Sequence, residues 1–65
     1  MTLNNTTDHD IYFNIDSGEF VSIKGQQCRV GIPANGSAVV DNALMFLLIL
    51  CNNFQAAYVM GYITV

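Results

Sequence analysis

Hydrophobic and polar positions follow a β-type pattern in the first forty residues and a helical pattern after them. Residues 11–15 and 28–32 place apolar side chains at every second position, and residues 20–23 are rich in β-branched and aromatic types. Both features are typical of half-buried strands. Turn residues at 16–18 and 24–26 separate the three segments. We therefore expect three consecutive short strands.

Residues 33–36, with the sequence Pro-Ala-Asn-Gly, are the strongest turn signal in the chain. Pro33 has no N–H group to donate to a strand ladder, and an Asn-Gly pair adopts the positive φ angles of a tight hairpin. This predicts a hairpin between the strand that ends at Ile32 and a further short strand at residues 37–40.

Residues 44–51 are eight apolar residues in a row, without a polar position for solvent. Asp41 can accept hydrogen bonds from the free N–H groups of a first helical turn, so we expect a helix over residues 42–51. Its core-facing stripe would consist of the residues at spacings i, i+3, i+4 and i+7. These are Leu44, Leu47, Leu48 and Cys51.

The opposite face of this helix is also apolar, because it would carry Phe46 and Ile49 with Met45 and Leu50 on its flanks. A 65-residue domain has too little mass to cover both faces of its own helix. We therefore predict that Met45, Phe46, Ile49 and Leu50 form an interface with a partner, a lipid or a neighbouring copy.

A second short helix is expected at residues 54–60, after the break at residues 52–53. Phe54 and Tyr58 share a face of it and are predicted to lie in the core, and Gly61 suits the left-handed position that ends a helix. Residues 62–65 are β-prone and are expected to pair with one of the strands between residues 20 and 40, because so small a fold must bring its last segment back onto the sheet.

The predicted fold is a small α+β domain over residues 11–65. An antiparallel sheet of about four to five short strands, the C-terminal strand included, packs with one apolar helix and a second short helix. Residues 1–10 are polar and are expected to form an N-terminal arm or a first edge segment.

The low charge content argues against a nucleic-acid partner. Only 11% of the residues are charged, the net charge is -3, and Lys24 and Arg29 are the only Lys or Arg residues. Binding to DNA or RNA requires several Lys or Arg side chains on one surface to neutralise phosphates. We therefore expect no nucleic-acid partner.

A membrane-spanning role is also not expected. Residues 43–51 are nine uninterrupted apolar residues, whereas a bilayer requires about 20. No basic cluster flanks the run, and the polar, acidic N-terminus does not resemble a signal peptide.

The residues that carry chemistry are few. His9 lies between Asp8 and Asp10, but neighbouring residues on an extended chain point to opposite sides and would not converge on a metal or a proton. No nucleophile has a second His to activate it, and no Gly-rich phosphate motif is present. We expect no catalytic residue, metal ligand or cofactor. Cys28 and Cys51 could form one disulfide, although their apolar surroundings favour two buried thiols.

Two stretches carry a family resemblance: IPANGSAVVD at residues 32–41 and FQAAYVMGYITV at residues 54–65. Over roughly residues 20–65 the chain resembles short proteins encoded among the virion genes of tailed bacteriophages. The resemblance implies a non-enzymatic structural protein of a phage particle, such as a capsid decoration or cement protein or a neck or tail accessory protein. It also implies partners among other phage structural proteins or copies of itself, and a location in the virion after assembly in the host cytoplasm.

The chain departs from such proteins in the helix, where Phe46, Ile49 and Leu50 occupy an outer face that is polar in the family. This difference favours burial of the helix in an assembly. Two alternatives stay open: a small regulatory protein-binding module, and a membrane-active peptide.

Overall fold

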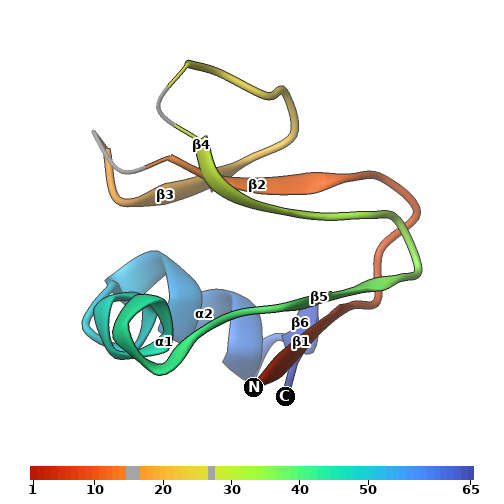
Figure 1. Ribbon diagram of the computed structural model, residues 1–65. Coiled ribbons are helices and arrows are strands. Elements are labelled where there is room, and N and C mark those ends of the chain that lie inside the picture. Colours follow the sequence, from red (N-terminus) through yellow and green to blue (C-terminus); the bar gives the residue numbers. More distant parts are fainter. Residues whose placement is uncertain (15–16, 27) are drawn as a thin grey trace.

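The computed structural model describes residues 1–14, 17–26 and 28–65. The chain has an α+β fold, and these residues form six strands and two helices (Figure 1). In chain order the elements are β1 (Thr2–Asn5), β2 (Ile11–Asn14), β3 (Glu19–Val21), β4 (Cys28–Ile32), β5 (Ser37–Val39), α1 (Asn42–Ile49), α2 (Asn52–Val59) and β6 (Ile63–Thr64). Ile15 and Asp16, which the sequence assigns to a strand and a turn, lie outside the described residues.

The strands form two antiparallel three-stranded sheets, which we call sheet A and sheet B. Sheet A has the order β5-β1-β6 and sheet B the order β3-β2-β4. In Figure 1 sheet B forms the upper layer, while sheet A and the two helices lie side by side in the lower layer. The prediction of one sheet with four to five strands is therefore only roughly matched.

The N-terminal segment is part of the fold and not a polar arm. β1 is the central strand of sheet A and pairs with both β5 and β6. Leu3 is fully buried, and the buried Asn5 side chain donates hydrogen bonds to the carbonyl oxygens of Ile32 at 3.0 Å and His9 at 2.8 Å. Asn5 Oδ1 accepts a bond from the Thr7 N–H at 2.9 Å, so the buried amide is fully partnered.

The predicted hairpin at residues 33–36 is wrong, although a turn does form there. β4 pairs with β2 in sheet B and β5 pairs with β1 in sheet A, so the turn carries the chain from one sheet to the other. Gly36 N–H donates to the Pro33 carbonyl at 2.9 Å, and Asn35 has a φ of 52°. Among the described residues Asn35 is the only non-glycine residue with positive φ. A tight type I′ hairpin needs positive φ at both central residues.

The helical segment forms two short helices. Asp41 Oδ1 accepts a 2.7 Å bond from the Leu44 N–H at the start of α1, as the sequence predicts. α1 ends two residues before Cys51, which is extended and precedes α2. Gly61, with a φ of +82°, follows the C-cap of α2. The two helices meet at 86°; neither alone has the length and apolarity of a membrane span, and only the bent pair taken together meets that criterion.

The C-terminal strand exists, but its partner differs from the predicted one. Asn4 lies opposite Thr64 and Asn5 opposite Ile63, so β6 pairs with β1 and not with a strand between residues 20 and 40. Ile63 is fully buried. The prediction failed because it started from an N-terminal arm and left β1 out of the sheet.

One hydrophobic core lies between the upper and lower layers. Its aromatic part runs from sheet B to α2: the ring centroids of Phe13 and Phe20 are 5.5 Å apart, and those of Phe20 and Phe54 are 6.1 Å apart. Sheet A, sheet B, α1 and α2 all supply buried side chains. These are Leu3, Ile11, Phe13, Ile32, Val40, Leu44, Met45, Leu48, Phe54 and Ile63.

Candidate assembly surface

The buried stripe of α1 is rotated from the predicted one. Leu44 and Leu48 lie in the core as expected, but Met45, predicted at the interface, is only 5% exposed. Leu47, predicted in the core, is 43% exposed. Both assignments are corrected: Met45 is a core residue, and Leu47 lies on the outer face.

The physical reason for this error is the uniform hydrophobicity of the helix. At about 100° per residue, Leu44, Leu48 and Met45 span one arc of the helix, and the next residues on either side are apolar too. No polar residue marks the solvent side between Ala43 and Ile49. The rotation of α1 is therefore set by packing against the rest of the core.

The outer face of α1 is a continuous apolar surface. Phe46 and Leu50 are each 67% exposed, and Leu47 and Ile49 flank them on the helix. We call these four residues the α1 face. Three of them, Phe46, Ile49 and Leu50, are predicted interface residues, and the structure leaves their side chains accessible. Their interface role stays a prediction.

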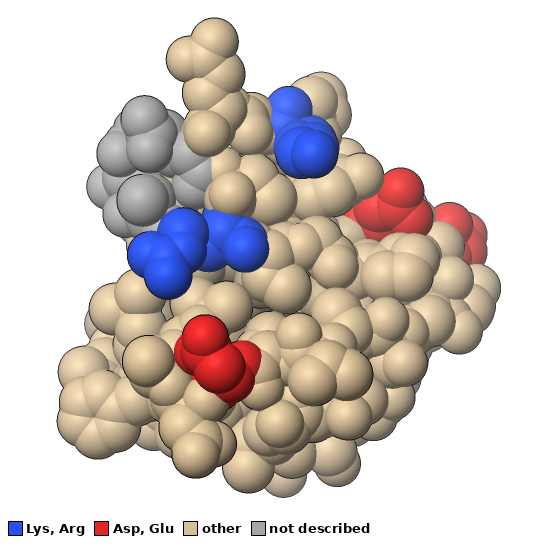
Figure 2. All heavy atoms as spheres, in the orientation of Figure 1, with Lys and Arg blue, Asp and Glu red and all other residues tan. Residues whose placement is uncertain are grey.

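The C-terminal part of the chain contains no charge. Residues 42–65 include no Asp, Glu, Lys, Arg or His. Figure 2 shows the consequence: apart from one red carboxylate group, the lower part of the molecule, which holds the helices, is tan, and the blue groups lie above it. Both cations come from sheet B or the segment between its strands, namely Arg29 on β4 and Lys24 between β3 and β4.

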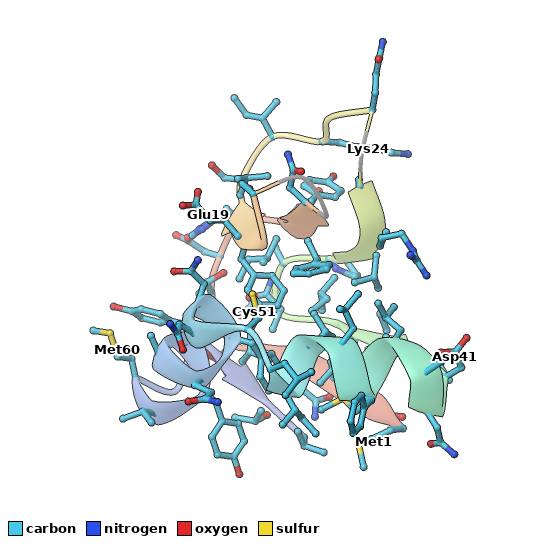
Figure 3. The ribbon with its side chains drawn as sticks, turned by 90° about the vertical axis from the view of Figure 1, so that its left-hand side faces the viewer. Met1, Glu19, Lys24, Asp41, Cys51 and Met60 are labelled. Carbon is cyan, nitrogen blue, oxygen red and sulfur yellow. The ribbon has the colours of Figure 1, made fainter. Side chains whose placement is uncertain are left out.

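The second helix contributes fewer core residues than predicted. Phe54 is buried, whereas Tyr58, predicted in the core, is half exposed, although its ring stacks on Phe54 at 6.4 Å. Val59 and Met60 at the end of α2 are also exposed. Cys51 is half-buried between the layers, and its thiol donates to the Gly18 carbonyl (Figure 3).

Both cysteines are free thiols in the structure. Cys28 is half-buried, and its Sγ donates to the Val30 carbonyl at 3.3 Å. Cys28 lies in sheet B, and Cys51 is on the link between the helices. Each thiol therefore donates to a backbone carbonyl, in the same strand for Cys28 and 33 residues away in the chain for Cys51.

The acidic cluster near the N-terminus has structural contacts. Asp10 accepts a 2.9 Å bond from the Ala34 N–H and a 3.2 Å bond from the Tyr12 hydroxyl. The pKa of Tyr12 is raised above its ordinary value, mainly by desolvation and secondly by the negative charge of the Asp10 carboxylate. The His9 imidazole lies 3.3 Å from the carboxylate of its neighbour Asp8, and both side chains are exposed. Within the described ranges, no three His, Cys, Asp or Glu side chains come together as a metal site.

An open groove of about 690 Å³ lies between β3 and α2. Four consecutive residues, Glu19 to Ser22, line its upper side, and Ala56, Ala57 and Met60 line its lower side. In Figure 3 Glu19 and Met60 mark these two sides on the same edge of the molecule. No sequence signal indicated this groove, because it depends on how α2 packs beneath sheet B.

No protein-family model, curated protein or solved structure matches the chain. The resemblance to tailed-phage virion proteins accordingly stays a prediction, and function must be inferred from the chain's own surfaces.

Proposed function

We propose that this protein is a non-enzymatic structural component of a multi-copy assembly, and that the α1 face is its main contact surface. The supporting observation is the exposure of Phe46, Leu47, Ile49 and Leu50 on one uncharged helix. Large contiguous apolar patches are uncommon on the surfaces of monomers and mark sites of interaction.

The absence of charged side chains within the α1 face supports an apolar partner. Residues 42–65 offer no charged side chain that could form an ion pair or steer a charged ligand. Burying this surface against a like surface brings no charges together, so the desolvation penalty of ionised groups does not arise. A second copy or another apolar protein surface satisfies this condition.

The size of the α1 face favours a many-copy assembly over an isolated pair. Burial of about 300 Å² of apolar surface per chain, at about 25 cal/mol per Å², corresponds to about 7.5 kcal/mol before the entropy of association is subtracted. Stable pairwise interfaces bury about 800 Å² per partner. A contact below this size gains strength when it is repeated over many copies.

The assembly that the sequence resemblance favours is the particle of a tailed bacteriophage. In this proposal the protein is a capsid decoration or cement protein, or a neck or tail accessory protein, and its partners are other phage structural proteins or copies of itself. It needs no cofactor. In the virion setting we expect the wild-type chain to sediment with purified particles.

The double variant Phe46→Glu/Ile49→Glu tests the proposal. Four negative charges on a pair of facing α1 surfaces oppose contact, whereas the exposed positions tolerate Glu without loss of the fold. We expect the wild-type chain to self-associate in sedimentation velocity and the variant to form smaller species with an unchanged circular dichroism spectrum. Loss of that spectrum in the variant would mean that the face is internal core.

A matched control is Ile23→Glu/Gln26→Glu, which adds the same charge in the exposed segment between β3 and β4. Self-association of this control should equal that of the wild type. A wild-type chain that stays monomeric at all concentrations would favour the regulatory binding module, and entry of the wild type into liposomes would favour the membrane-active peptide.

A further inference from the structure

β3 is an edge strand with one unpaired side. It pairs with β2 through Val21 opposite Tyr12, Phe20 opposite Phe13 and Glu19 opposite Asn14. Within the described residues no other strand pairs with β3. The N–H and C=O groups that point away from β2 are therefore available to a further strand.

The other edge of sheet B is less regular. The register between β2 and β4 shifts between Phe13 and Asn14, and such irregularities protect an edge against further pairing. No shift interrupts the register between β2 and β3. The two edges of the sheet are thus unequal, and β3 is the more suitable template.

The groove lies along this free edge. Every residue from Glu19 to Ser22 lines its upper side, so the groove extends along the whole length of β3. Its lower side carries the small residues Ala56 and Ala57 of α2. A strand added to β3 would therefore have room for side chains between sheet B and α2.

We propose that β3 of one copy pairs antiparallel with β3 of a second copy, with Phe20 of each strand opposite Phe20 of the other. The two B sheets then form one continuous six-stranded sheet. Phe20 packs toward Phe54 at 6.1 Å, so it points to the helical side of sheet B. Directly opposed residues point to the same face, and the partner's Phe20 would enter the groove.

The charges on β3 agree with this register. A two-fold axis through Phe20 places Glu19 of one copy opposite Val21 of the other. The two Glu19 carboxylates are then not directly opposed. No Lys or Arg lines the groove, so filling it would not bury an unpaired basic side chain. Like charges directly opposite each other would weaken a strand pair.

This second contact rests on the proposed assembly function and makes it geometrically possible. A single two-fold interface through the α1 face closes at a dimer. An extended array requires at least one further, different contact on each copy. The β3 edge belongs to the opposite layer from α1 and can serve as that contact while the α1 face is occupied (Figure 1).

The experiment uses the Phe46→Glu/Ile49→Glu chain as its background, so that the α1 face no longer contributes. We expect this background to dimerise at high concentration in sedimentation equilibrium. Adding Val21→Glu places a carboxylate opposite each partner's Glu19 and should raise the dimer dissociation constant roughly tenfold. Adding Val21→Lys creates two Glu–Lys pairs and should lower it.

The matched controls are Ile23→Glu and Ile23→Lys, which make the same charge changes two residues after Val21, outside the strand. Neither should change the dissociation constant. The proposal would be overturned if the Phe46→Glu/Ile49→Glu chain stays monomeric, or if both Val21 variants shift the dimer dissociation constant in the same direction. The first result is also expected if the natural occupant of the groove is a strand of another protein. Amide exchange at residues 19–21 of the background chain, which should slow as concentration rises, provides a readout if Val21→Glu impairs folding.

Both proposals can fail separately. If the wild-type chain associates no more strongly than the Phe46→Glu/Ile49→Glu variant, the α1 face is not a contact surface, and the result with the Val21 variants is unaffected. If the background is monomeric while the wild type associates, the α1 face holds the copies together and β3 does not.

Discussion

The two parts of the chain, residues 1–41 and residues 42–65, differ in their content of charged side chains. Residues 1–41 carry every ionisable Asp, Glu, Lys, Arg and His side chain, and residues 42–65 carry none. The first part supplies both edges of sheet B, while the second supplies the helices and β6. A fold of this size could distribute its charge over all surfaces. This segregation is the basis for our proposal that the helical side contacts other molecules.

Polar groups in the first part stabilise the fold. Asp10 binds the Ala34 N–H, Asn5 links β1 to the end of β4, and Asp41 caps α1. In the second part the exposed side chains of Phe46 and Leu50 contribute nothing comparable to the isolated fold. Substitutions should therefore affect stability in the first part and in the core, and association on the α1 face.

Deletion of residues 62–65 should have the largest effect on the fold. It removes β6, leaves one side of β1 unpaired and opens the core at the fully buried Ile63. We expect a loss of several kcal/mol, comparable with the whole stability of a small domain. Circular dichroism of the truncated chain should show loss of structure. Cooperative unfolding at the wild-type midpoint would show that β6 is not needed.

The pair Leu48→Ala and Leu47→Ala compares the two faces of α1 with identical chemistry. Leu48 is fully buried, so its truncation should lower the free energy of unfolding by about 3 kcal/mol. Leu47→Ala should lower it by about 1 kcal/mol or less, because its side chain is partly solvated in the folded state. Urea titration of both variants gives the difference. Equal losses would contradict the rotation of α1 described above.

Gly36→Val should destabilise the turn between the two sheets by about 1 kcal/mol or more. A Cβ atom at residue 36 would lie 2.9 Å from Pro33 Cγ and 3.3 Å from the Pro33 carbonyl oxygen. The sequence predicts the same loss from positive φ at the turn, but the positive φ belongs to Asn35. Ala34→Val is the control, since it leaves Gly36 unchanged. A denaturation midpoint equal to wild type would contradict this account of the turn.

The smallest effect concerns Tyr12 at high pH. Desolvation and Asp10 raise the pKa of Tyr12 in the folded state, so the fold favours the protonated hydroxyl. The protonated Tyr12 hydroxyl therefore contributes to stability below the ordinary pKa of 10.0. This contribution is lost as pH rises through the higher pKa of Tyr12 in the folded state. Asp10→Asn keeps an oxygen for the Ala34 N–H, removes the charge and should lower the pKa. Tyrosinate absorbance during titration measures this shift, and an unchanged titration would exclude the Asp10 contribution.

The elements with local signals could be predicted from the sequence. Asp41 before an apolar run predicts the helix cap, and Gly61 predicts the end of α2, because both depend on a few neighbouring residues. The α+β class follows from the change in hydrophobic period. The strand at residues 62–65 is signalled by its β-prone composition.

The arrangement of these elements could not be predicted in the same way. β1 has only Leu3 as an apolar anchor, and its place in sheet A depends on partners more than thirty residues away. The orientation of α1 depends on packing, since every candidate face is apolar. The groove beside β3 arises only when α2 packs beneath sheet B, and no motif marks such a site.

The contact surface itself can be tested by hydroxyl-radical footprinting of the wild-type chain over a dilution series. Phe46 and Leu50 report on the α1 face, and the exposed Ile23 is an internal reference. The proposed assembly predicts that labelling of Phe46 and Leu50 is low at high concentration and rises on dilution, while labelling of Ile23 stays constant. Full labelling of Phe46 and Leu50 in a chain that is still associated would contradict the proposal.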